Sequence, residues 1–247
     1  MARMKFMNTE IDNLTMQETL QAIDQLIREN KSAYVVTPNV DHIVQLETNK
    51  ELQAVYKNAS LILTDGKPLL WIANWYGTPI KEKISGSDLF PLLCKMAAEK
   101  GYKMFFLGAA EGVAAKAAEN LMNRFKGLQV TGTYSPPFGF EKDPVEMDKI
   151  KSMIKASGAD ILIVGLGCPK QEKFMYHHCA ELGVPISFGL GASFDFEAGN
   201  IKRAPRWMAN HGLEWLFRIT QDPKRMAKRY LVDDRKIFGL AIKYRRR

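Results

Sequence analysis

The stretch Ile161-Leu-Ile-Val-Gly-Leu-Gly-Cys-Pro-Lys-Gln-Glu172 decides how the rest of this chain is interpreted. Its first four residues form a continuous apolar run rich in β-branched side chains, which is typical of a strand buried on both faces. Gly165 and Gly167 then permit a sharp turn with room for a ligand. Pro169 suits the first turn of a helix, which we expect from about residue 170 to 182. The stretch therefore predicts a strand, a glycine loop and a helix N-terminus.

Such a helix N-terminus directs unpaired N–H groups at the loop and favours an anion such as a diphosphate. Gln171 and Glu172 lie in the first helical turn, where their side chains can reach the same ligand. The loop is not the Gly-x-Gly-x-x-Gly fingerprint of dinucleotide sites, because Lys170 occupies the place of the third glycine. It is not a P-loop either, because no Gly-Lys-Ser/Thr follows. The loop therefore predicts an anion site without identifying the ligand.

Similar apolar runs recur at a spacing of roughly 25 residues, with helical patterns between them. The predicted strands cover residues 33–36, 61–63, 103–107, 128–132, 161–164 and 184–188. Residues 4–7 are expected to form a short edge strand. This alternation predicts an α/β fold over residues 1–200, with a doubly wound, mostly parallel, Rossmann-like sheet. Right-handed crossovers then bring the loops that begin at Thr37, Asp65, Gly108, Gly132, Gly165 and Gly189 to one edge, where such sheets bind ligands.

Composition and charge limit the class of protein. The chain has 247 residues and three cysteines, too few for a disulfide framework, which indicates a reducing compartment. Its first residues lack the apolar segment of a signal peptide, and no apolar run approaches the roughly 18 residues of a spanning helix. Residues 201–247 have a net charge of +10, and since the whole chain is +8, residues 1–200 carry −2. A basic tail on a near-neutral body indicates an anionic partner for the tail.

The tail, residues 201–247, interleaves Trp, Phe, Leu and Ile with Lys and Arg, as expected of amphipathic helices at an anionic membrane surface. We therefore predict a basic helical appendage on a cytoplasmic protein that is peripheral on the inner face of the plasma membrane. Nucleic acid would also explain the charge, but the apolar content suits lipid at least as well. The apolar residues 213–219 would also suit self-association as a homo-oligomer.

Several polar residues at strand ends have both a catalytic and an ordinary interpretation. Asp65 follows a buried strand, where burial would raise its pKa towards that of a general base, but it would also suit a turn. Thr37 and Asn39 suit sugar recognition, or simply a turn and a helix cap. Asp41-His42 lacks a second ligand pair with metal spacing, and Asp195 with Glu197 is only a weak match to a divalent-ion pair. Cys168 lies in the ligand loop, but no placed histidine suggests an activated thiol, so we expect it to contact the ligand without chemistry.

Ordered blocks of sequence resemble the WecG/TagA/CpsF glycosyltransferases, glycosyltransferase family 26. The blocks are Gly165–Glu172, Gly189–Gly199, Lys202–Met208 and Gly212–Arg218, preceded by Thr37–Asn39, Thr64–Gly66, Ser85–Asp88 and Phe106–Gly108. The resemblance extends from about residue 7 to 230. It implies transfer of an N-acetylmannosamine-type sugar from a UDP donor to polyprenyl-diphosphate-linked N-acetylglucosamine, as in the linkage unit of wall teichoic acid. It also implies inversion at the sugar and no essential metal or other cofactor.

The resemblance also assigns roles to residues of this chain. Asp65 matches the proposed catalytic base. Thr37, Asn39, Lys83 and Ser87 match the acceptor pocket, although the family pattern has Arg-Val where this chain has Lys83-Ile84. The UDP-sugar site is expected to comprise Gly108, Gly132, Tyr134, Gly167, Pro169, Lys170, Gln171, Glu172, Gly191 and Asp195. The diphosphate is expected to contact Arg203, Arg206, Arg218, Arg225 and Arg229 of the appendage.

Two alternatives remain beside this reading. The donor sugar would equally fit the oxidised uronic-acid form, UDP-ManNAcA. An NAD-dependent Rossmann oxidoreductase shares the sheet and a glycine loop, but the complete fingerprint and its acidic residue are missing from the sequence.

Overall fold

A computed structural model describes residues 3–205, 207–208 and 211–245. Within these residues, six strands form one parallel sheet in the order β4-β3-β8-β7-β5-β6. The strands are β3 (Ala33–Val36), β4 (Leu61–Ile62), β5 (Lys103–Gly108), β6 (Gln129–Tyr134), β7 (Ile161–Gly165) and β8 (Ile186–Gly189). The predicted doubly wound α/β fold is confirmed, and all the neighbouring strands of this sheet pair in parallel.

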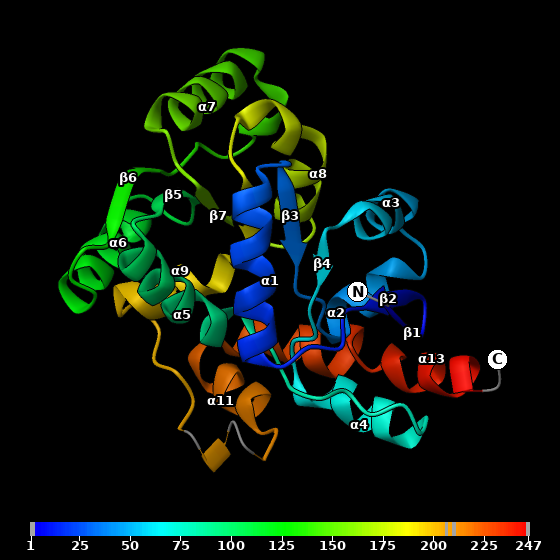
Figure 1. The fold of residues 1–247 in the computed structure, drawn as a ribbon. Coiled ribbons are helices and arrows are strands. Elements are labelled where there is room, and N and C mark those ends of the chain that lie inside the picture. The colour runs from blue at the N-terminus through cyan, green and yellow to red at the C-terminus, as the bar shows by residue number, and fades with distance from the viewer. Residues whose placement is uncertain (1–2, 206, 209–210, 246–247) are drawn as a thin grey trace.

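Helices cover both faces of the sheet, and each face has its own apolar core (Figure 1). One core includes residues of α1 (Met16–Glu29), α5 (Gly86–Lys100), α6 (Val113–Arg124) and α9 (Gly191–Ala198). The other includes residues of α2 (Val40–Leu46), α3 (Lys50–Asn58), α4 (Lys67–Trp75), α7 (Pro144–Ser157) and α8 (Lys170–Leu182). The central strand β7 has buried residues from Ile161 to Val164, as its continuous apolar run requires.

Two expected strands are present but differ from the expectation in detail. The N-terminal strand β1 (Met4–Phe6) does not join the main sheet but pairs antiparallel with β2 (Thr9–Ile11) in a hairpin of its own. Met7, at its turn, has φ of 50°, which reverses the chain direction. The strand expected to end at Gly132 instead continues to Tyr134, so the loop at this corner of the sheet begins later in the chain.

The basic C-terminal segment is helical and packs on the body. It contains α11 (Glu214–Gln221), α12 (Pro223–Lys228), a π-helical turn (Arg229–Asp233) and α13 (Lys236–Arg245). Ile237 and Ala241 of α13 are buried in the same core as α2 and α4, and the Tyr76 hydroxyl donates to the Ala241 carbonyl at 2.7 Å. The predicted helical appendage is therefore confirmed, whereas a domain boundary at residue 200 stays a prediction.

Candidate active site

Two turns at the carboxyl edge of the sheet hold Asp65 beside the start of α2. Strands β3 and β4 are parallel neighbours, so the turns that follow them leave the same edge. The backbone N–H of Asp65 donates to the carbonyl of Pro38 at 2.8 Å and joins the two turns. Gly66 then has φ of 103°, a conformation that favours glycine, and leads the chain into α4. The sheet topology thus places Asp65 near Asn39, as the sequence predicted.

A cavity of about 750 Å³ lies between α4 and the C-terminal helices, and Asp65 and Asn39 are in its lining. Much of the lining is apolar: Trp71, Ile72 and Trp75 come from α4, and Trp215, Leu231, Ile237, Phe238 and Ile242 come from the C-terminal segment. Phe238 is 73% exposed and Trp71 54% exposed, so the apolar wall continues to the molecular surface. The charged lining comprises Asp65, Lys67, Lys83, Glu214, Arg218, Arg229, Asp234 and Arg235. The cavity therefore combines a large apolar wall with charged groups.

Asp65 has a carboxyl whose pKa is raised by its surroundings. Burial raises the pKa of its carboxyl to about 6, although the positive charges of Arg218 and Lys83 act in the opposite direction. A carboxyl with this pKa is mostly ionised at neutral pH and is a stronger base than an exposed aspartate. The predicted shift of Asp65 towards a base is therefore supported by its surroundings.

Arg218 is held close to Asp65 by its own helix. Its guanidinium donates to the Glu214 carboxylate, one turn earlier in α11, at 2.6 Å. It also lies 5.7 Å from the centre of the Phe196 ring. Burial acts to lower the pKa of Arg218, but the carboxylates of Glu214 and Asp65 outweigh it and raise that pKa. A fixed cation therefore stands near the candidate base.

Arg229 links the C-terminal segment to the turn after β3. Its guanidinium donates to the Asn39 side-chain oxygen at 3.2 Å and lies 3.6 Å from the Asp41 carboxylate. Asn39 also caps α2, since its side-chain oxygen accepts the backbone N–H of His42 at 3.4 Å. Asn39 is thus a helix cap and also lines the cavity, and its part in sugar recognition stays a prediction. Thr37 is buried just before it.

A second charged group forms at the start of α5. The carboxylate of Asp88 lies 3.2 Å from the Lys83 ammonium and also accepts a bond from Arg203. Arg203 donates to the Ser87 hydroxyl at 3.3 Å as well. Burial acts to raise the pKa of Asp88, but the bonds from Ser85 and Arg203 outweigh it and lower that pKa to about 2. Lys83 and Arg203 thus form a pair of cations around one ionised carboxylate, and the Ser87 hydroxyl bonds with Arg203 beside them.

The glycine loop after β7 has the predicted form. Helix α8 begins at Lys170, directly after the loop, and Gly167 has φ of 77°. Gln171 is 6% exposed and lies against the next loop along the edge, where a Cβ on Gly191 would come within 2.8 Å of its side-chain oxygen. Gly108 is equally constrained, because a Cβ there would lie 2.4 Å from the Gly165 carbonyl. These glycines allow three loops to pack closely at the sheet edge.

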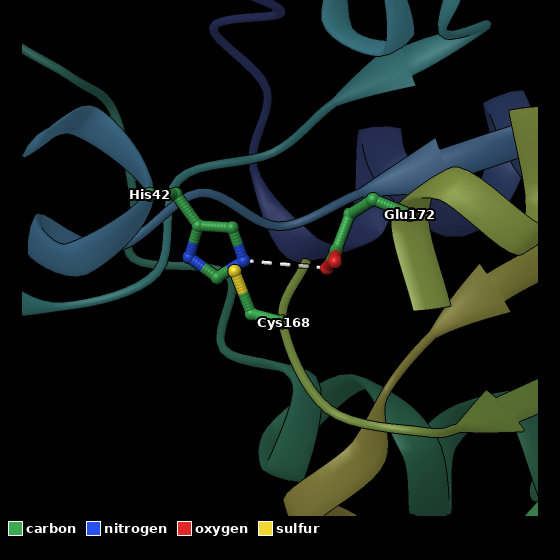
Figure 2. Close-up of side chains that lie close together, drawn as sticks. All are labelled: His42, Cys168 and Glu172. Atoms are coloured by element: carbon green, nitrogen blue, oxygen red, sulfur yellow. Dashed lines mark hydrogen bonds and ion pairs between the residues drawn. The ribbon is translucent and has the colours of Figure 1, made fainter. Parts of the chain in front are cut away.

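Behind this loop, His42 of α2, Cys168 of the loop and Glu172 of α8 point toward one another (Figure 2). Their nitrogen, sulfur and oxygen atoms all lie within 4.8 Å of each other, and His42 Nε2 is 3.3 Å from Glu172 Oε1. Among the residues that the structure describes, this is the group whose geometry would suit a metal ion. Asp195 and Glu197 are the other carboxylates considered for a divalent ion. Glu197 forms an ion pair with Arg124 at 2.8 Å, so its carboxylate already has a cationic partner.

Other residues expected at the donor site have different contacts. The Tyr134 hydroxyl bonds with the Glu146 carboxylate and accepts from Lys149 at 2.5 Å, on α7. Lys170 pairs with Glu141 at 2.7 Å. Gly132 lies inside β6, where a Cβ would meet the Phe105 ring at 2.4 Å, so its lack of a side chain serves packing.

The remaining expected residues fall into three groups. Pro169 follows a cis peptide bond in the loop. Asp195 is partly buried in α9, where its backbone carbonyl accepts from Asn200 at 3.0 Å. Arg206 lies outside the described residues, and so does the side chain of Arg225.

Sequence reasoning missed part of the cavity. Trp71 and Trp75 are four residues apart on α4, so they share one face of the helix, and that spacing could have indicated an exposed aromatic wall. Glu214, which anchors Arg218, is four residues before it on α11. Asp234 lines the same cavity, where burial raises the pKa of its carboxyl to about 6. No local pattern in the sequence predicted that Asp234 would line the same cavity as Asp65.

Comparison with known proteins supplies the family context. The sequence matches the Glycosyl transferase WecG/TagA/CpsF family over residues 4–247. An N-acetylglucosaminyldiphosphoundecaprenol N-acetyl-beta-D-mannosaminyltransferase of Bacillus spizizenii is 33% identical over 223 residues, which cover 90% of this chain and 83% of that protein. A protein of the same name from Bacillus subtilis is 30% identical over 203 residues, 82% of this chain and 75% of that one. No helix in the described part of the chain has the length and hydrophobicity needed to cross a bilayer.

Proposed function

We propose a specific transfer reaction for this chain, which belongs to the WecG/TagA/CpsF family of glycosyl transferases. The reaction moves N-acetylmannosamine from UDP-ManNAc to N-acetylglucosamine on undecaprenyl diphosphate, as in assembly of the wall teichoic acid linkage unit. The names of the two Bacillus relatives support the acceptor and the transferred sugar. The family match displaces the dehydrogenase alternative. The observation that carries the proposal is the raised pKa of the Asp65 carboxyl, which lies in the wall of a largely apolar cavity.

The cavity suits an acceptor that has a lipid, a diphosphate and a sugar. Its aromatic and aliphatic wall, which includes Trp71, Trp75 and Phe238, would cover the first isoprene units of the lipid. Arg218 and Arg229 lie in the same lining and carry the positive charge that a diphosphate needs. An acceptor held by both groups would present its sugar to Asp65 and Asn39.

Chemistry at this site is an inverting displacement. The ionised carboxylate of Asp65 accepts the proton of the acceptor sugar's hydroxyl as the hydroxyl oxygen attacks the anomeric carbon of the donor. A new carbon–oxygen bond forms on the face opposite the UDP, and the bond to the diphosphate oxygen breaks, so UDP leaves with its electron pair. One proton moves to Asp65 and the configuration at the sugar inverts.

Negative charge grows on the leaving diphosphate, and we assign its stabilisation to protein cations without an essential metal. Arg218 is fixed near Asp65 by Glu214, and Lys83 lies near the same carboxyl. The N-terminus of α8 and the packed glycine loops are the proposed donor site, with Gln171 and Gly191 in contact there. A preorganised cation costs no rearrangement during the reaction, which is why fixed arginines would replace a metal ion.

The apolar rim of the cavity also supports peripheral attachment to the cytoplasmic membrane surface. Phe238 and Ile242 of α13 are 73% and 50% exposed, and Arg245 lies 4.2 Å above the Trp75 ring. Aromatic side chains beside arginines suit an anionic bilayer interface. Attachment there would place the mouth of the cavity where lipid-linked acceptors are found.

The test is UDP release from UDP-ManNAc with a short-chain lipid-diphosphate-GlcNAc acceptor in the presence of EDTA. Turnover supports the reaction, the donor and metal independence together, and a parallel assay with UDP-ManNAcA separates the two donors. Asp65→Asn should lower turnover by about 10²–10⁴-fold while UDP binding is kept. Asp234→Asn is the matched control, since that carboxyl lies in the same cavity with a similarly raised pKa, and it should cost far less. Equal losses in the two variants would contradict the assignment of Asp65 as base.

A further inference from the structure

The group formed by His42, Cys168 and Glu172 brings buried acceptor atoms together that need a proton or a metal ion between them. His42 and Glu172 are 6% and 2% exposed, so water does not compensate for poor contacts there. The three side chains come from α2, from the loop after β7 and from α8, and they converge on one point (Figure 2). The reaction proposed above uses none of the three in a chemical step.

The bonds of the imidazole fix which of its nitrogens carries hydrogen. His42 Nδ1 lies 2.8 Å from the side-chain oxygen of Asn39, which also accepts from the His42 backbone N–H and from Arg229. Since that oxygen is an acceptor for three partners, Nδ1 must donate. The backbone N–H of Asn39 also points at Nδ1, at 3.3 Å, and that contact would need Nδ1 to accept, but the contact with the Asn39 oxygen is shorter, at 2.8 Å, and outweighs it. Nε2 of a neutral His42 is then left with a lone pair.

That lone pair faces another acceptor. Nε2 is 3.3 Å from Glu172 Oε1, which already accepts the Gln171 amide at 2.8 Å. Two acceptors this close repel each other unless a proton or a metal ion lies between them. Glu172 Oε2 is buried with no hydrogen-bond partner among the described residues, and so is the hydroxyl of Tyr56, whose ring centre is 6.3 Å from that of His42. Unpartnered buried oxygens are costly, and they point to a missing ligand.

We propose that His42 Nε2, Cys168 Sγ and a Glu172 carboxylate oxygen bind a zinc ion. Imidazole, thiolate and carboxylate are the usual zinc ligands, whereas magnesium and calcium prefer oxygen alone. Bonds of about 2.0–2.2 Å in a tetrahedral site set ligand nitrogen and oxygen atoms roughly 3.3–3.5 Å apart, close to the observed 3.3 Å. The sulfur needs only a small movement, since all three ligand atoms lie within 4.8 Å of one another.

The surroundings match those of a metal-binding histidine. A ligating histidine normally donates its second N–H to a carbonyl or carboxylate, and His42 Nδ1 donates to the Asn39 side-chain carbonyl. Cys168 is only partly buried, so the group is not fully closed to solvent. A water molecule would complete the fourth position. The bound ion would tie α2, which begins beside Asn39, to the loop and to the helix that carries Gln171.

Isothermal titration of metal-stripped protein with Zn²⁺ tests the site directly, on the full chain without a polyhistidine tag. We expect one ion per chain, a Kd below about 1 μM, and release of the Cys168 thiol proton, measured by repeating the titration in buffers of different ionisation enthalpy. Cys168→Ser should weaken binding at least about 100-fold and remove that proton release. Co²⁺ should show a sulfur-to-metal charge-transfer absorption in the wild-type protein and lose it in the same variant.

Two controls separate this site from others on the chain. Cys179→Ser removes a buried thiol of the same helix α8 and should bind zinc as the wild type does. A double variant, His177→Ala with His178→Ala, removes the two surface imidazoles of α8, and it should also retain the ion. Binding that survives Cys168→Ser but is lost in the double histidine variant would overturn the proposal. Absence of binding in the wild type would also overturn it, and His42 and Glu172 would then share only a proton. The metal-free melting temperature of Cys168→Ser should equal that of metal-stripped wild type, which excludes misfolding as the reason for lost binding.

Discussion

The raised pKa of Asp65 makes a quantitative prediction about the pH dependence of turnover. With a pKa of about 6, roughly nine in ten of the Asp65 carboxyls are ionised at pH 7 and only about one in ten at pH 5. An aspartate with the ordinary value of 3.8 would remain more than nine-tenths ionised at both pH values. Since only the ionised carboxylate accepts a proton, kcat/KM should fall about tenfold from pH 7 to pH 5.

A substitution at Arg218 tests whether Asp65 is the group that causes the fall in kcat/KM at low pH. Its positive charge lowers the pKa of Asp65 and so opposes the effect of burial. Arg218→Gln should therefore move the midpoint of the acidic limb above 6, in addition to lowering the maximal rate through lost diphosphate stabilisation. The pKa of Asp65 is taken from the midpoint pH of the acidic limb, and the maximal rate from its plateau, so the pKa shift and the loss of rate are measured separately.

The assay is initial UDP release between pH 4.5 and 8.5 with subsaturating acceptor. Enzyme held at pH 5 and returned to pH 7 must recover its full rate, which excludes acid denaturation as the cause of the limb. A profile that is flat between pH 5 and 7 would refute the raised pKa. A midpoint that moves downwards in Arg218→Gln would refute the arrangement of charges around Asp65.

Further predictions concern stability, anchoring and the membrane. The folded-state pKa of Asp65 is raised, so ionising this carboxyl destabilises the fold. This destabilisation is zero below about pH 4, grows up to about pH 6 and is complete at pH 7. Asp65→Asn should therefore raise the free energy of unfolding at pH 7 by about 1–3 kcal/mol, measured by urea unfolding. Glu214→Gln should loosen Arg218 and reduce kcat about 10-fold with little change in UDP affinity, and an unchanged kcat would show that Arg218 needs no anchor. Ile237→Ala should destabilise the docking of α13 by about 2–4 kcal/mol, seen as faster hydrogen exchange in that helix. Phe238→Ser, on the exposed side of α13, should weaken sedimentation with anionic vesicles while the melting temperature stays constant, and undiminished sedimentation would contradict a role in membrane attachment.

Elements with local start and stop signals were predictable from sequence. Helix α8 runs from Lys170 to Leu182 as expected, because Pro169 precedes it and Gly183, at φ of 70°, ends it. The cap of α1 is likewise local, since the Thr15 and Glu18 side chains each bond the other's backbone N–H. The β1–β2 hairpin was missed because three-residue strands carry too little periodicity to show which partner they pair with.

Site residues were predictable only where the sheet itself determines their place. Asp65 and Asn39 follow paired strands, so the rule for parallel sheets places both at one edge. The rule does not fix where long side chains point. Lys170 begins the expected helix and was expected at the UDP-sugar site, but its side chain pairs with Glu141. His42 and Cys168 are 126 positions apart, and no spacing rule links them, so their proximity comes only from the packing of α2 against the loop after β7.

The strand order has a consequence for how the chain folds during synthesis. β8 is the last strand in sequence, yet it lies between β3 and β7 and connects the β4–β3 pair to the β7–β5–β6 group. Ala33 pairs with Ile186, which is synthesised about 150 residues later. At roughly 5–20 residues per second, that delay is about 8–30 seconds on the ribosome. Until then both halves of the sheet have an unpaired inner edge, open to wrong strand pairing. Nascent chains arrested before residue 186 should thus engage chaperones and resist proteolysis poorly, and protection should appear in one step once β8 has left the exit tunnel.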